Sequence, residues 1–176
     1  FQSKLDQFNG SRYFTQIYES SLQATYYGLY ILNALGELDM VNTSEVVRYI
    51  MSNYNTSSHT FMDSYAYRYL DTDFSQKFYP YSSVLEVNCY ALLSLAILGK
   101  LDEINPQYSA EFIFSCYSPE TSGFIGQPYS PSLHPNFRIS AMDNTYYAIV
   151  ALQALGVDWS AYSSQRTQLI TYIKGL

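Results

Sequence analysis

Three stretches of the chain share one order of apolar and polar positions and align with one another without a gap. They begin at Ser20, Ser83 and Ser140, so the repeats are offset by 63 and 57 residues. Four positions hold a matching large apolar residue or tyrosine in every repeat: Leu22/Leu85/Met142, Tyr27/Tyr90/Tyr147, Leu32/Leu95/Leu152 and Leu35/Leu98/Leu155. Self-similarity of this kind predicts an architecture built from one repeated supersecondary unit.

Each repeat is expected to begin with a helix of about four turns that is apolar most of the way round and therefore buried on several sides. Ser20, Ser83 and Ser140 are predicted as N-caps. An acid or amide that would complete a capping box follows three residues later: Gln23, Glu86 and Asp143. An acidic ring around a cavity mouth is the alternative interpretation of these three residues. A glycine with positive φ is expected to end each helix: Gly36, Gly99 and Gly156.

A second, more amphipathic segment follows each glycine: Ser44–Asn53, Pro106–Cys116 and Ser163–Lys174. A buried helix, a turn with glycine and an outer helix with one wet face make a helical hairpin. We therefore predict an all-α fold of three antiparallel helical hairpins in a single domain over residues 1–176. The repeats are expected at about residues 11–60, 61–123 and 124–176.

The composition fits a folded domain and excludes several classes of partner. Hydrophobic residues make up 48% and charged residues 14% of the 176 residues, and the net charge is −6. A basic stripe for nucleic acid is missing. The most apolar stretch, Ala91–Leu98, is too short to cross a membrane. A soluble protein is expected, with a cytoplasmic or an extracellular location left open. The chain begins at Phe1 and not at a methionine, which is typical of an excerpt or a processed product.

The two cysteines do not form a disulfide framework. Cys89 lies near the start of one predicted inner helix and Cys116 near the end of its outer partner, where an antiparallel hairpin brings the ends together. A disulfide is one interpretation, and two free buried thiols are the favoured one. Three Asn-x-Ser/Thr sequences, at Asn9, Asn42 and Asn55, leave secretion open.

The order of buried helix, glycine, outer helix and Gly-Phe turn resembles the prenyltransferase/squalene-cyclase repeat. The stretch from Ser122 to Pro128 is similar to the family's GGFGG-x-P turn, whereas the first repeat keeps only Phe61 of it. In that family the hairpins stack into an α/α toroid whose inner helices line a central cavity. The resemblance implies that the three hairpins form part of such a toroid.

The catalytic residues of the family are not carried over. Protein prenyltransferase β subunits hold zinc with an Asp-x-Cys and a histidine, and the matching positions here are Val87, Cys89 and Asn144. One ligand cannot hold a zinc ion that needs at least three. The DxDD acid of terpene cyclases has its nearest counterpart in Asp71-Thr72-Asp73-Phe74, which lacks the last acid. We predict no catalytic residue, no metal and no cofactor.

Tyrosine is unusually frequent, at 20 residues, and it gathers at matching positions of the inner helices. The candidate ligand-binding residues are Tyr26, Tyr27, Tyr90, Tyr146 and Tyr147. In a toroid some of these rings would face the cavity, although ordinary core packing explains them as well. We predict a non-catalytic module that binds a protein or an apolar, isoprenoid-like molecule on a concave tyrosine-rich face. The alternatives are part of a prenyltransferase-like or terpene-cyclase-like enzyme, and a structural half-ring that forms a homodimer.

Overall fold

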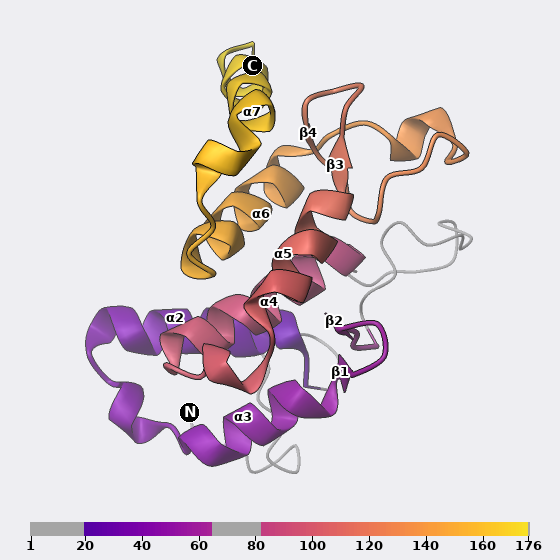
Figure 1. Ribbon diagram of the computed structural model, residues 1–176. Coiled ribbons are helices and arrows are strands. Elements are labelled where there is room, and N and C mark those ends of the chain that lie inside the picture. Colours follow the sequence, from indigo (N-terminus) through magenta and orange to yellow (C-terminus); the bar gives the residue numbers. More distant parts are fainter. Residues whose placement is uncertain (1–19, 65–81, 176) are drawn as a thin grey trace.

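The computed structural model describes residues 20–64 and 82–175, and this part of the chain folds into three helical hairpins (Figure 1). The inner helices are α2 (Leu22–Leu35), α4 (Val84–Ile97) and α6 (Met142–Ala154). The outer helices are α3 (Thr43–Ser52), α5 (Pro106–Ser115) and α7 (Ser163–Lys174). These bounds confirm the predicted hairpins and the predicted helical fold class.

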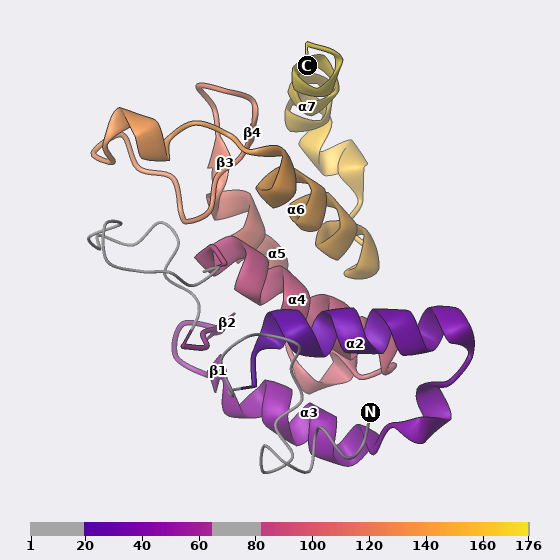
Figure 2. The same cartoon turned by 180° about the vertical axis from the view of Figure 1, so that it is seen from behind.

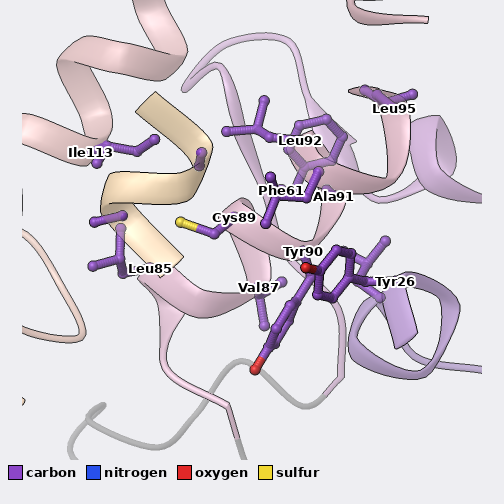
Figure 3. Close-up of a cluster of buried hydrophobic side chains, with 14 of the residues drawn as sticks. Tyr26, Phe61, Leu85, Val87, Cys89, Tyr90, Ala91, Leu92, Leu95 and Ile113 are labelled. Atoms are coloured by element: carbon purple, nitrogen blue, oxygen red, sulfur yellow. The ribbon is translucent and has the colours of Figure 1, made fainter. Parts of the chain in front are cut away.

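The core lies around α4, which packs between α2 and α6 (Figure 2). Every side chain from Val84 to Leu95 is buried, because α4 has an inner helix on each side and outer helices behind it. Figure 3 shows that the side chains of two neighbouring α4 residues point to opposite sides of the helix: Tyr90 lies beside Tyr26 of α2, and Cys89 points away from it. A helix that is apolar all round requires such a central position.

The three inner helices end in the same way. Gly36, Gly99 and Gly156 have φ of 75°, 65° and 72°. The residue after each glycine donates its backbone N–H to a carbonyl in the last turn of the helix. Glu37 donates to Leu32 over 2.8 Å, Lys100 to Leu95 over 2.8 Å and Val157 to Leu152 over 3.1 Å. This is the Schellman arrangement, in which the left-handed residue is normally glycine because a Cβ there is strained. The sequence-based prediction of these three helix ends is confirmed.

Replacing Gly99 by valine is expected to lower the free energy of unfolding by about 1–2 kcal/mol, because a β-branched residue is strained at positive φ. A Cβ at Gly99 meets no atom within 4 Å, so the effect measures backbone strain alone. The matched control is Gly28→Ala, which also meets nothing within 4 Å but lies inside α2. It should raise stability by roughly 0.5–1 kcal/mol. Urea unfolding measures both. A Gly99→Val variant as stable as the unmodified chain would contradict the strain assigned to the positive φ of Gly99.

The predicted helix starts are correct for one repeat and wrong for two. Ser83 and Glu86 form a complete capping box at α4. The N-cap of α2 is Ser21, not Ser20, and its side chain accepts from the N–H of Ala24. The N-cap of α6 is Ala141, not Ser140, and no side-chain hydrogen bond caps that helix. Gln23 and Asp143 are consequently not capping-box residues.

Two short β-ladders, which the sequence analysis did not predict, follow the first two outer helices. Strand β1 (Tyr54–Asn55) pairs with β2 (Thr60–Phe61), and β3 (Tyr117–Ser118) pairs with β4 (Gly123–Phe124), both antiparallel. The turns between them place His59 and Ser122 at φ of 55° and 62°. Glycine adopts this backbone most easily, and Ser122 aligns with the first glycine of the GGFGG-x-P turn.

Each ladder connects its own hairpin with the next one. The amide of Asn88 on α4 accepts from the N–H of Phe61 over 2.6 Å and donates to its carbonyl over 2.9 Å. In the equivalent place on α6, the hydroxyl of Thr145 accepts from the N–H of Phe124 over 3.0 Å. Both phenylalanine side chains are buried in the core. The ladders therefore fix the spacing between successive inner helices.

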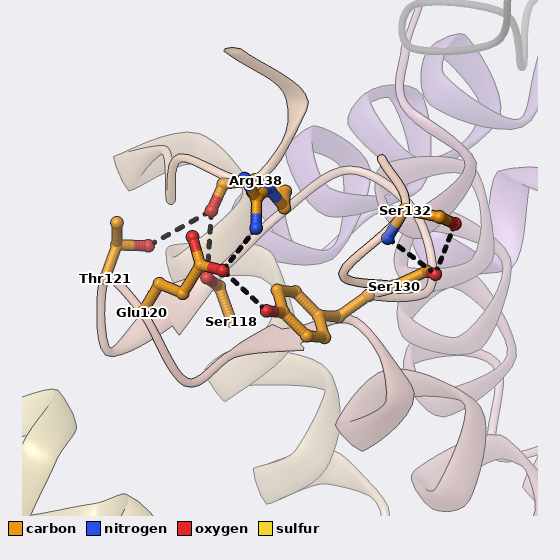
Figure 4. A network of polar contacts seen from close by, with 7 residues as sticks. Ser118, Glu120, Thr121, Ser130, Ser132 and Arg138 are labelled. Atoms are coloured by element: carbon orange, nitrogen blue, oxygen red, sulfur yellow. Dashed lines mark hydrogen bonds and ion pairs between the residues drawn. The ribbon is translucent and has the colours of Figure 1, made fainter. Parts of the chain in front are cut away.

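The loop between β4 and α6 is fastened to the β3–β4 turn by polar contacts (Figure 4). The Arg138 guanidinium lies 2.5 Å from the carboxylate of Glu120, and Tyr129 donates to the same oxygen over 2.8 Å. Ser118 donates to the carbonyl of Arg138 over 2.8 Å. These contacts hold the loop beside the turn just before α6 begins.

Both cysteines are free and buried, in agreement with the favoured interpretation of the sequence. Burial raises the pKa of the Cys89 thiol well above its usual range and raises that of Cys116 to about 12. Both thiols therefore stay protonated at neutral pH.

Within residues 20–64 and 82–175, each helix is too short or too polar to cross a lipid bilayer.

Candidate binding site

The three tyrosines that occupy the same repeat position converge on one place. The hydroxyl of Tyr27 lies 3.0 Å from that of Tyr147 and 3.5 Å from that of Tyr90. The rings of Tyr90 and Tyr147 pack edge to face, with centroids 4.8 Å apart. One side chain from each of α2, α4 and α6 thus meets at a single point, although the residues are up to 120 positions apart.

The remaining two predicted tyrosines belong to the same cluster. Tyr26 stacks on Tyr90 with centroids 5.6 Å apart, and Tyr146 packs edge to face on Tyr147 at 5.1 Å. Tyr30, which the sequence analysis did not single out, packs 6.0 Å from Tyr26. We call these six residues the tyrosine cluster: Tyr26, Tyr27, Tyr30, Tyr90, Tyr146 and Tyr147.

The cluster has a buried layer and an exposed layer. Tyr26 and Tyr90 are only 7% and 1% exposed, so their rings form the buried layer on which the exposed rings pack. Tyr27, Tyr30 and Tyr146 are 40%, 57% and 55% exposed. These three, called the open tyrosines below, are the members that a bound molecule can touch without a rearrangement of the core.

Burial and mutual hydrogen bonding keep the inner hydroxyls protonated. The pKa of Tyr90 is raised above its usual value by burial first, and then by the nearby Glu86 carboxylate and the hydroxyl of Tyr27. The pKa of Tyr147 is raised by burial and by its hydrogen bond with Tyr27. Gln23 donates to the Tyr90 hydroxyl over 3.3 Å. The hydroxyls of Tyr90 and Tyr147 therefore stay neutral at physiological pH.

The stability of the protein should fall above about pH 10, the usual pKa of tyrosine in an unfolded chain. Because the folded-state pKa of Tyr90 is raised, its contribution is fully present below that pH. It is lost as the pH rises, since the unfolded state releases the proton first. The decline from Tyr90 is at most about 1.4 kcal/mol per pH unit. Urea unfolding between about pH 8 and pH 11 measures it, and an equally steep decline in Tyr90→Phe would contradict this assignment.

The residues at the family's zinc position do not fit a zinc ion. The side chain of Val87 is buried and apolar, and Cys89 is a protonated thiol by virtue of its raised pKa. The amide of Asn144 is fully buried, and its oxygen accepts from the hydroxyl of Ser83 over 2.6 Å. Among residues 20–64 and 82–175, no three His, Cys, Asp or Glu side chains gather as metal ligands. Asp71-Thr72-Asp73-Phe74 lies outside the described residues.

Hairpins of a buried inner helix and an outer helix, joined here through short β-ladders, define the α/α hairpin-repeat class of helical proteins. The model of the prenyltransferase alpha-alpha toroid domain matches residues 1–61 and again residues 59–176, and the chain belongs to this family. A search of curated proteins found no match.

Proposed function

We propose that this chain is a non-catalytic helical-repeat module that binds an apolar, isoprenoid-like molecule or an apolar protein segment. The binding surface is the tyrosine cluster, and the open tyrosines make the contacts. The observation that carries the proposal is the convergence of equivalent tyrosines from three hairpins, with Tyr27 and Tyr30 still exposed beside the buried rings.

Exposed tyrosines on rigid helices suit such a role. The ring offers a large apolar surface that loses little conformational entropy on binding, and the hydroxyl keeps the surface wettable when no ligand is present. Tyr27 is held in place by its hydrogen bonds to two neighbouring hydroxyls. A ligand therefore meets a surface that is already ordered, which lowers the free-energy cost of binding.

Isothermal titration calorimetry with farnesol tests the proposal for the small-molecule ligand. Tyr27→Ala and Tyr30→Ala should each weaken binding by about tenfold or more, since an aromatic contact contributes about 1.4 kcal/mol or more at such sites. Met40→Ala is the matched control, because Met40 is exposed in the turn after α2 and lies outside the cluster. Far-UV circular dichroism should stay helical in all three variants.

Unchanged affinity in both tyrosine variants would contradict the tyrosine cluster as the binding surface. If farnesol does not bind the unmodified chain, the isoprenoid ligand is contradicted and an apolar protein segment becomes the expected ligand. That arm is tested by photo-crosslinking from a benzoylphenylalanine placed at Tyr30.

A further inference from the structure

Three hydroxyls of the tyrosine cluster form a continuous set of hydrogen bonds, called the hydroxyl network below. The Gln23 amide donates to the hydroxyl of Tyr90 over 3.3 Å. The Tyr90 hydroxyl lies 3.5 Å from that of Tyr27, which in turn lies 3.0 Å from that of Tyr147. The network therefore begins at Gln23 and ends at Tyr147, and it joins α2, α4 and α6.

The hydroxyl network holds one proton more than its own contacts use. Three hydroxyls carry three protons, whereas two contacts join these hydroxyls and each contact uses one proton. The Gln23 amide faces Tyr90 with its N–H, so it does not accept the third proton. Within residues 20–64 and 82–175, the three hydroxyls make no other hydrogen bond. The third proton is therefore available to an acceptor outside the network.

Burial determines which hydroxyl keeps the third proton. Tyr90 is 1% exposed, and a buried hydroxyl whose proton has no acceptor is unfavourable. Tyr90 therefore donates its proton to Tyr27. The contact between Tyr27 and Tyr147 lies at the surface, because Tyr27 is 40% exposed. The third proton thus belongs to these two residues, called the Tyr27–Tyr147 pair below.

The Tyr27–Tyr147 pair lies among apolar ring surfaces. Tyr27 is itself an open tyrosine, and Tyr146 packs edge to face on Tyr147 with centroids 5.1 Å apart. A molecule that covers the open tyrosines therefore passes beside the hydroxyls of the pair. A small number of polar groups in an otherwise apolar site is the usual means of orienting a bound molecule.

We infer that the molecule bound at the tyrosine cluster carries a neutral oxygen that accepts a hydrogen bond from the Tyr27–Tyr147 pair. The inference rests on the proposed function, and it narrows the ligand to isoprenoid alcohols and ketones, as opposed to isoprenoid hydrocarbons. One available proton suits one neutral oxygen, whereas a diphosphate group is bound through several donors or cations.

Isothermal titration calorimetry with farnesol and farnesene tests the inference, because only farnesol carries an oxygen. The double variant Tyr27→Phe/Tyr147→Phe keeps both rings and removes both hydroxyls of the pair. It should weaken the binding of farnesol by about fivefold or more and change that of farnesene by less than about twofold. Tyr108→Phe, which removes an exposed hydroxyl from α5, is the control and should change neither affinity.

The outcomes separate the inference from the proposed function. Equal effects of the double variant on farnesol and farnesene would overturn the inference and leave the tyrosine cluster as a site for isoprenoids. Tighter binding of farnesyl diphosphate than of farnesol to the unmodified chain would also overturn the inference alone. If none of the three compounds binds, the isoprenoid ligand of the proposed function is contradicted, and the inference falls with it.

Infrared spectroscopy of bound geranylacetone tests the hydrogen bond in the unmodified chain. This isoprenoid ketone can accept a hydrogen bond and cannot donate one, and its carbonyl absorbs at a lower wavenumber when it accepts than it does in an alkane. We expect the lower wavenumber in the unmodified chain and the alkane value in the Tyr27→Phe/Tyr147→Phe variant. The alkane value in the unmodified chain, or the same lower wavenumber in both proteins, would overturn the inference.

Discussion

Asn88→Leu is expected to lower the free energy of unfolding by about 3–5 kcal/mol, the largest effect of any substitution considered. The replacement has a similar volume, so it leaves no cavity. It does leave the N–H and the carbonyl of Phe61 buried without their partner, since both bond to the Asn88 amide. Each buried backbone group that loses its partner costs about 1–3 kcal/mol. Denaturant unfolding followed by circular dichroism measures the loss.

Thr145→Val is the matched control for Asn88→Leu, because it removes one equivalent hydrogen bond instead of two. Only the N–H of Phe124 depends on the Thr145 hydroxyl, so the expected loss is about 1–2 kcal/mol. Equal losses in the two variants would contradict the role given to the Asn88 amide in joining the first ladder to α4.

Gly123→Ala is expected to destabilise the protein by about 2–3 kcal/mol through overpacking. A Cβ at this position would lie 2.8 Å from the Cβ of Ser140 and 3.0 Å from the hydroxyl oxygen of Thr145. The Ser140 Cβ is fixed to the backbone, so a side-chain rotation cannot relieve the overlap. The φ of Gly123 is not positive, and the effect is therefore steric. Thermal and urea unfolding both report it.

A double variant separates this clash from a general loss of the turn. Ser140→Gly removes the Cβ and the hydroxyl that the new methyl group would meet, at the expense of the hydrogen bond between Ser140 and Thr121. The double variant should be more stable than the sum of the two single effects by about 1 kcal/mol or more. Simple additivity of the two single effects would contradict the proposed overlap.

The hairpins could be predicted from the sequence because their signals are local. A left-handed glycine after an apolar stretch ends a helix wherever the rest of the chain lies, and Gly36, Gly99 and Gly156 all do so. The outer helices likewise begin and end within a residue or so of the predicted amphipathic segments.

The helix starts and the ladders depend on distant contacts, which the local pattern does not contain. The first N–H of α2 is satisfied by the carboxylate of Asp63, 41 residues away, in addition to the Ser21 cap. At α6, the N–H of Ala141 bonds to the carbonyl of Phe124. A serine one residue earlier was therefore unnecessary as a cap, and the prediction from Ser20 and Ser140 failed.

The membership of the tyrosine cluster was partly predictable. Repeat alignment places Tyr27, Tyr90 and Tyr147 at one position, and equivalent positions of stacked hairpins lie close together. Tyr30 was missed because its counterparts, Leu93 and Val150, are not aromatic. The exposure of each ring depends on which helices pack beside it. That packing is a tertiary feature, which the local sequence pattern does not contain.

The most direct test of the tyrosine cluster as a binding surface is nuclear magnetic resonance of the chain labelled with ¹³C in its tyrosine rings, titrated with farnesol. Individual tyrosine-to-phenylalanine variants assign the signals. The account predicts that the signals of Tyr27 and Tyr30 shift as farnesol is added, whereas that of Tyr108, which is exposed on α5, stays in place. Shifts at Tyr108 without shifts at Tyr27 and Tyr30 would contradict it.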